Sequence, residues 1–398
     1  MANWAKLQEQ LTGLPVVKRA KHSIHFDKGN GQIVANFSGK PCHYQDTDGL
    51  WKPIDTRLLL GADGFYGCPH SPVKVKPDGR VKVTGSDYSQ FSELPGRPIG
   101  RVDGDKIVRE FPGGYQELFV TEDGFREVIT VIKPTFPIEK FLARQSGTLP
   151  SIYKAHARTA VDANGDMFEI TSDTKAFGNW LNKAAYPVTI DPDFAGASGD
   201  HTIYADDAVY ATAHATADKE ITFDLYTGQM LSGGLYYVYR SVLGFDTSSI
   251  GTNTISQVNL KLTVHYEQSA TDFDVQIVKY DWDGITNIDA LFDGVLAADQ
   301  DDNIFCNTAG KSVNTQYTSG NLSTTWVDKS GVTYYGLRSS LDVAETAPSG
   351  NDRFVLYDSS ATTESYRPVL VVTYTAAGGF HPINLSANMQ SLNGNMRG

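Results

Sequence analysis

Tight-turn sequences divide the first part of this chain into short segments. Segments of this length limit the secondary structure that the chain can form. Between residues 22 and 132, turn sequences such as "DKGNGQ", "DTDGLW", "KPDGRV" and "TEDGF" recur every 10 to 20 residues. Asp-Gly and Asn-Gly supply the positive φ angles that tight hairpin turns need. Alternating runs such as "RVKVTG" and "KIVREF" lie between them. The sequence therefore predicts an all-β fold built from antiparallel hairpins.

The second half of the chain alternates more regularly. In "ISQVNLKLTVHY" the apolar residues Val258, Leu260, Leu262 and Val264 are separated by Asn259, Lys261, Thr263 and His265. Such alternation is typical of a sandwich strand with one face in solvent. We therefore expect a jelly-roll-like antiparallel β-sandwich in this half.

The most apolar stretch of the chain, "ESYRPVLVVTYT", lies near its C-terminal end. Residues 369–374 show no alternation, so neither face of this strand is expected to meet water. Pro368 fits only at the start of a strand, because proline has no N–H to donate within a sheet. The pattern predicts a central last strand that closes the core of the sandwich.

These patterns divide the chain into four regions. Trp4, Leu7 and Leu11 recur at helical spacing before Gly13 and Pro15, which predicts a short amphipathic helix that docks on a neighbour or packs on its own domain. The proline-containing "AAYPVTIDPDF" and the small residues after it indicate a boundary near 195–200. The predicted regions are an N-terminal helix or arm (1–20), a β-rich anchoring region (21–195), the sandwich (196–376) and a polar C-terminal arm (377–398).

Charge is distributed unevenly between the two halves. The net charge is −12, with 24 Lys and Arg against 23 Asp and Glu in residues 1–195, so residues 196–398 carry −13. An acidic surface opposes phosphate binding, so nucleic acid is not an expected partner. The N-terminus has no signal-peptide pattern, and no apolar run is long enough to predict membrane insertion.

The cysteines predict neither a disulfide framework nor a zinc site. Cys42, Cys68 and Cys306 are far apart and no CxxC motif is present. Cys42 and Cys68 would pair only if their strands adjoin, and the other interpretation is that both are buried thiols.

Signatures of enzymes and cofactors are missing from the sequence, which predicts a protein that is not an enzyme and has no cofactor. No GxSxG, HExxH, GxxxxGK[ST] or strand-linked GxGxxG motif occurs. Carboxylates are frequent in residues 280–294 and 298–305. They are either the paired catalytic carboxylates of a glycosidase or surface groups that face water. Asp299, Asp301 and Asn303 resemble a calcium loop, but Ile304 replaces the glycine that an EF-hand requires. A casual surface Ca²⁺ is the most this segment predicts.

Aromatic residues in the acidic half suggest a glycan site. Trp282, Trp326 and Tyr334 lie in a region rich in carboxylates and amides, and β-sandwiches hold sugar rings with such groups. The competing interpretation is that most of these rings belong to the core.

Two segments of the second half together resemble the DNRLRE-type β-sandwich domain. "YRSVLGFDTSSIGTNTISQVNLKLTV" (239–264) and "SYRPVLVVTYT" (365–375) match its pattern at Arg240, Leu243, Phe245, Asp246, Leu260, Leu262, Val264, Arg367, Pro368, Leu370, Val372 and Tyr374. The opening "DHTIYADDAVYAT" departs from the usual start of the module. The resemblance covers about residues 200–376 and implies an adhesive or carbohydrate-binding-like sandwich of large bacterial surface proteins and phage virions.

The expected function combines this resemblance with the lack of export signals. A phage virion protein folds in the host cytoplasm and reaches the outside by lysis, so the sequence predicts a structural virion protein of the tail or an exposed head or decoration position. Its expected partners are copies of itself, other virion proteins and a host surface glycan. The alternatives are a carbohydrate-binding adhesin, a surface-filament subunit located on the cell exterior, and a depolymerase.

Overall fold

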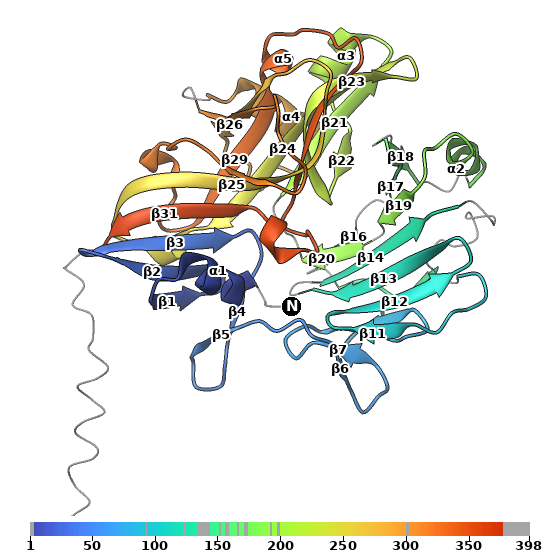
Figure 1. The fold of residues 1–398 in the computed structure, drawn as a ribbon, viewed down its shortest axis with the longest axis horizontal. Helices are drawn as coiled ribbons and strands as arrows, with labels where there is room; N and C mark the ends of the chain where they lie inside the picture. Colours follow the sequence, from blue (N-terminus) through green and yellow to red (C-terminus); the bar gives the residue numbers. More distant parts are fainter. Residues whose placement is uncertain are drawn as a thin grey trace, which may run out of the picture.

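The chain folds into two layered β units that lie side by side (Figure 1). The computed structural model describes residues 4–92, 94–121, 124–133, 144–150, 153–155, 159–164, 167–170, 174–191, 193–196, 200–299 and 303–376. All the sheets are antiparallel and helices are short and few, which confirms the all-β class. The predicted C-terminal arm, residues 377–398, lies outside the described residues.

The larger unit is a sandwich built on one continuous 14-stranded sheet that folds over on itself. The strands follow the order β1-β2-β3-β31-β25-β30-β23-β24-β29-β26-β27, with β21, β22 and β28 attached beside this path. Their bounds are β1 (Val16–Ala20), β2 (Ser23–Gly29), β3 (Gln32–Ser38), β21 (His201–Asp207), β22 (Lys219–Ile221), β23 (Asp224–Ser232), β24 (Leu235–Asp246), β25 (Thr254–Ser269), β26 (Asp274–Lys279), β27 (Ile304–Asn307), β28 (Gln316–Thr318), β29 (Val332–Ser339), β30 (Asn351–Tyr357) and β31 (Val369–Thr375).

Strand β25 connects the two layers of the sandwich. Its first part pairs with β31, and its last part, from Val264 onward, pairs with β30. The register shifts between Val264 and Tyr266, so His265 is the extra residue of a β-bulge. A bulge bends its strand, which lets one strand pass from the first layer to the second.

The last strand, β31, occupies the central position that its sequence predicts. It pairs with β3 on one side and with β25 on the other. Figure 1 shows β31 in red between blue β3 and yellow β25. Leu370, Val372 and Tyr374 are buried in the main core of the sandwich. Pro368 directly precedes the strand, where its missing N–H breaks no ladder bond.

The pairing of β3 with β31 moves the predicted border at residue 20. Residues 16–20 were expected in the N-terminal arm and residues 21–38 in the β-rich anchoring region, but both form a sheet with the last strand of the sandwich. Ile33, Ala35 and Phe37 of β3 enter the main core of the sandwich. The reason is physical: β31 has two apolar faces and two edges, and β25 covers only one of those edges.

The N-terminal helix forms as predicted and packs on its own chain. Helix α1 (Trp4–Thr12) buries Trp4 and Ala5 against Phe26 of β2 and Val369 of β31. Leu11, by contrast, is exposed. Of the two alternatives, the buried face of the helix packs on its own chain.

The smaller unit consists of two facing sheets that share a core. A six-stranded sheet has the order β15-β10-β9-β8-β7-β6, and a nine-stranded sheet has the order β11-β12-β13-β14-β19-β17-β18 with β16 and β20 attached. Valines of β8 and β9 pack against Ile107, Leu118 and Phe125 of the second sheet. The bounds are β6 (Leu59–Leu60), β7 (Tyr66–Gly67), β8 (Val73–Val75), β9 (Arg80–Val83), β10 (Ser89–Phe91), β11 (Arg101–Asp103), β12 (Lys106–Phe111), β13 (Gly114–Val120), β14 (Gly124–Val131), β15 (Arg144–Ser146), β16 (Tyr153–Ala155), β17 (Thr159–Val161), β18 (Met167–Glu169), β19 (Val188–Asp191) and β20 (Asp193–Gly196).

The remaining elements cover or connect the sheets. Hairpin β4 (His43–Gln45) and β5 (Trp51–Pro53) links the two units, and helix α2 (Thr174–Leu181) packs on one end of the nine-stranded sheet. The sandwich carries helices α3 (Tyr210–Ala215), α4 (Ile288–Ala297) and α5 (Ser340–Val343), and the 3₁₀ turns η2 (Ser248–Ile250), η3 (Thr324–Trp326) and η4 (Glu364–Tyr366). Among the described residues no helix has the length and apolarity to cross a membrane.

Buried polar groups join helices α4 and α5 to the sandwich. Arg240 of β24 is fully buried and donates Nε and Nη2 to the two carboxylate oxygens of Asp342, at 2.8 and 2.9 Å. Its Nη1 donates to the carbonyl of Phe292 at 3.0 Å, and the guanidinium carbon lies 3.6 Å from the centre of that ring. One arginine therefore ties both α4 and α5 to β24.

Candidate functional site

The residues predicted to bind a glycan separate into two groups in the structure. Trp326 lies in η3, is 8% exposed and belongs to the main core of the sandwich, with its ring 6.3 Å from Tyr335. It has no open face for a sugar, so the core interpretation holds for this residue. Trp282 and Tyr334 are half-buried and lie together at the surface.

Trp282 and Tyr334 form an edge-on aromatic pair. Trp282 stands in the turn between β26 and α4, and its ring centre is 4.8 Å from that of Tyr334 in β29, at an interplanar angle of 62°. His201, at the start of β21, meets Trp282 from another direction at 5.7 Å. The indole N–H is buried and has no hydrogen-bond partner within the described residues. The accessible part of Trp282 is therefore its carbon rim.

A carboxylate completes this small surface. Burial raises the pKa of Tyr334 to about 12, and the hydrogen-bonded carboxylate of Asp283 acts in the same direction. An aromatic rim beside a carboxylate can contact the C–H face of a sugar ring and accept a hydrogen bond from one of its hydroxyls. The geometry supports a shallow contact with one ring and does not form a deep pocket.

The calcium-like segment cannot be assembled from the described residues. Asp299 and Asn303 are described, and Asp301 lies outside the described residues. No group of three or more His, Cys, Asp or Glu side chains that could hold a metal ion occurs within the described part of the chain.

The three cysteines do not form a disulfide. Cys42 and Cys68 are buried in two different cores, Cys42 under α1 and Cys68 between the sheets of the smaller unit. Burial raises the pKa of Cys306 to about 12, which keeps its thiol protonated and unreactive at neutral pH.

The sandwich carries an aromatic column that sequence patterns did not predict. His265 stacks on Tyr266 at 4.0 Å and on Tyr357 at 4.1 Å, and Tyr357 stacks on Tyr366 at 4.7 Å. The bulge at His265 makes this arrangement possible, because it removes the strict alternation that would place residues 265 and 266 on opposite faces. His265 Nδ1 also lies 2.9 Å from Asp224 Oδ2. The rings cover one another's faces, so the column is a packing element with exposed edges.

The two units meet at a polar seam near this column. Arg126 of β14 donates to the carbonyl of Ser360 at 2.9 Å, and Gln268 of β25 donates to the carbonyl of Asn164 at 2.6 Å. Asp358, beside Ser360, is buried, and its burial together with the neighbouring Asp200 raises its pKa well above the ordinary value. Directional hydrogen bonds across the seam fix the orientation of the smaller unit against the sandwich.

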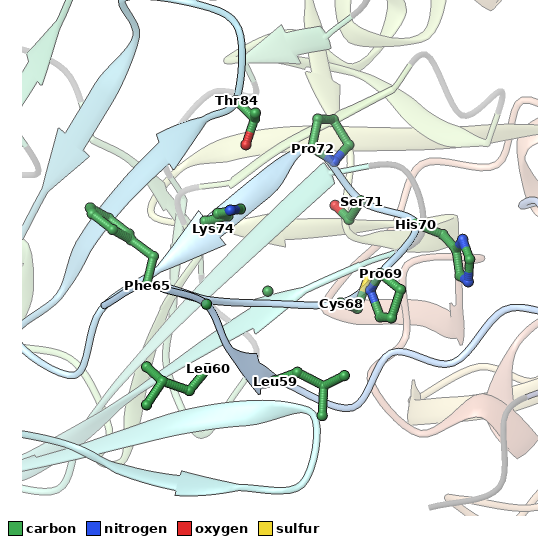
Figure 2. Close-up of a pocket in the computed structure, with 12 residues that line it drawn as sticks. Leu59, Leu60, Phe65, Cys68, Pro69, His70, Ser71, Pro72, Lys74 and Thr84 are labelled. Atoms are coloured by element: carbon green, nitrogen blue, oxygen red, sulfur yellow. The ribbon is translucent and has the colours of Figure 1, made fainter. Parts of the chain in front are cut away.

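A cavity lies in the smaller unit, outside all predicted site residues. It has a volume of about 620 Å³ and opens beside β6, β7 and β8. Figure 2 shows Leu59 and Leu60 along one side, with Lys74 and Thr84 across the opening from them. Its other lining residues include Phe65, Cys68, Pro69, His70, Ser71 and Pro72. This volume lies within the range of small-ligand and side-chain pockets.

Comparison with known proteins assigns no family to the chain. No family model matches the sequence, and no curated protein matches it. A search of solved structures returned the crystal structure of the infectious bursal disease virus VP2 subviral particle, which is 11% identical over 95% of this chain and 83% of that chain. The TM-score of that match is 0.13, and it therefore carries no argument about fold or function.

Proposed function

We propose that this chain is a structural protein of a bacteriophage virion, with its acidic β-sandwich facing outward and its polar C-terminal arm contacting neighbouring subunits. The observation that carries the proposal is where the residues of the DNRLRE-type resemblance lie. Leu243, Phe245, Leu260, Leu262, Val264, Leu370, Val372 and Tyr374 all belong to the one main core of the sandwich. The resembling segments therefore pack in one core, which supports the proposal that they form one module of this type.

The architecture suits a rigid building block. The first hairpin and the last strand lie side by side in the sandwich, and hydrogen bonds at the seam attach the smaller unit. A subunit held together in this way can contact neighbours at both ends while its two units keep the same relative orientation. Its most acidic half, at −13, would face the surroundings, and this charge keeps an exposed surface soluble.

Mass in solution tests this proposal. We expect the full chain to form a discrete oligomer or filament, and the chain truncated after Thr375 to be monomeric, because truncation removes the predicted arm. Sedimentation velocity on both proteins gives the masses, and unchanged circular dichroism shows that the truncated protein is folded. A full-length protein that stays monomeric at every concentration contradicts self-assembly.

A second candidate function rests on the pair Trp282 and Tyr334. If the chain is an adhesin for a host surface glycan, Trp282→Ala removes the aromatic rim and abolishes binding on a glycan array. Phe305→Leu is the matched control, because Phe305 is a buried residue of the core and touches no ligand surface. Binding that survives Trp282→Ala, or an array without any bound glycan, rules out this site.

A further inference from the structure

The 620 Å³ cavity lies at an open sheet edge with exposed leucines. Strand β6 is the last strand of the six-stranded sheet, so one side of its backbone has no strand partner along the sheet path. Leu59 and Leu60 are 60% and 63% exposed and line the cavity (Figure 2). Exposed apolar side chains at a sheet edge favour association with another chain.

The rim of this cavity is basic. Residues 59–83 contain Lys74, Lys76, Arg80 and Lys82 against Asp63 and Asp78, a balance of +2. The alternation in β8 and β9 buries the valines and directs the lysines outward. Lys76 and Lys82 stand over the Phe65 ring at 4.5 and 4.2 Å from its centre. A partner for this face must therefore combine an apolar residue with negative charge.

The sandwich of the same chain has an edge with the opposite properties. Strand β27 is the last strand at that end of the sheet path, and its first residue, Ile304, is 43% exposed. Asp274 lies opposite Asn307 of β27, and Asp272 lies beside it near Thr308. Asp299 is exposed at the end of the segment after α4. Lys311 lies near Cys306 of β27, and Arg338 lies near Asp299 but is buried, so the accessible charges are three carboxylates and Lys311, a balance of −2.

We propose that the β27 edge of one copy docks in the Leu59–Leu60 cavity of a second copy. Ile304 enters the cavity, and the carboxylates of residues 272, 274 and 299 face Lys74 and Lys76 of the other chain. The inference deepens the proposed function and rests on it, because it names the surface through which the subunits would associate. The +2 and −2 balances identify a second copy as the occupant.

This contact joins two different surfaces, so each copy keeps one free docking surface of each kind. Such heterologous contacts generate rings when the rotation closes and filaments when it does not. The C-terminal arm and this contact would act together, since linked weak contacts strengthen one another. Loss of either contact is then enough to lower the assembled mass.

Charge exchange in the full-length protein tests the contact. One variant carries Lys74→Glu and Lys76→Glu, and Lys82 is kept because it is the closer of the two lysines that pair with Asp63, at 2.8 Å against 3.3 Å for Lys74. The other carries Asp272→Lys and Asp299→Lys. Each variant alone presents like charges on both surfaces, so we expect each to be monomeric. An equimolar mixture presents opposite charges at every contact, and we expect it to assemble as the wild type does.

Leu60→Asp provides a second route that leaves the lysines in place. We expect this variant to be monomeric, and Ile99→Asp to assemble normally, because Ile99 is an exposed apolar residue away from the cavity lining. Circular dichroism and melting curves identify any variant that fails to fold. The inference is overturned if the single charge variants and Leu60→Asp assemble like the wild type, or if the mixture stays monomeric. In the first case the proposed self-assembly stands and only the surface is wrong, whereas a monomeric wild-type chain overturns both.

Discussion

Replacing Asp342 by asparagine is expected to lower the free energy of unfolding of the sandwich by about 3–5 kcal/mol, because it leaves the Arg240 guanidinium buried without a counter-charge. Both side chains are fully buried, and the bidentate contact is the only carboxylate contact recorded for Arg240 in the described residues. The carbonyls of Phe292 and His214 remain as acceptors, but they carry no full negative charge. Urea denaturation followed by hydrogen exchange in β24 and β29 measures the loss in this unit.

Two further variants separate the charge from the packing. The double variant Arg240→Met with Asp342→Leu fills the same space without buried charge, and we expect it to recover most of the lost stability. Glu117→Gln removes one partner of the half-exposed pair with Lys106, and we expect a loss of about 0.2–1 kcal/mol. A loss below about 1 kcal/mol for Asp342→Asn would show that water reaches Arg240, contrary to its burial here.

The second large effect concerns the N-terminal hairpin. Phe37→Ala in β3 is expected to destabilise the sandwich by about 3–5 kcal/mol, since Phe37 is fully buried and its loss leaves a cavity. Phe37 lies opposite Leu370 of β31, more than three hundred residues later in the chain. Hydrogen exchange measures the effect directly, and we expect protection to fall in β31 and β25.

The smaller unit supplies the control for this prediction. Leu118→Ala removes a buried side chain from the core between its two sheets, and we expect protection to fall in β12 and β13. If Phe37→Ala instead lowered protection in β12 and β13 and spared β31, residues 21–38 would belong with the smaller unit, as the sequence predicted. Phe37→Leu should show a smaller loss in the same strands.

The sequence predicted features that depend on local pattern. Residues 369–374 lack alternation, and only a central strand has two buried faces, so the position of β31 followed from the sequence. Helix α1 followed from the spacing of its apolar residues and from Gly13 and Pro15 after it. The alternation of buried and accessible residues in β25 was also predicted from the sequence, and Val258, Leu260 and Leu262 are buried.

Features that depend on distant partners did not follow from the sequence. The β3–β31 pairing joins two segments whose patterns give no information about each other. Trp326 and Trp282 have similar polar neighbours in sequence, yet one is in the core and the other at the surface. The bulge at His265 reverses the face expected for one side chain, and no residue there signals it.

Helix α4 has a local sequence signal, unlike the features above. The carboxylates of residues 280–294 drew attention to an acidic loop, but residues 288–297 form a helix. Asn287 caps it by accepting from the Ala290 N–H at 2.8 Å, and Leu291, Phe292 and Val295 form its buried face. An Asn N-cap before apolar residues at helical spacing would have predicted it.

The joining of β3 to β31 also has a consequence during translation. After Ser38 leaves the ribosome, more than three hundred residues must follow before Val369 can pair with it. At typical elongation rates this interval lasts about 20–70 s, during which the nascent β2–β3 hairpin exposes an unpaired apolar edge. The hairpin is therefore the segment of the newborn chain most open to chaperones and to wrong pairing with other nascent chains, and codon changes that slow synthesis after residue 38 should lower the soluble yield.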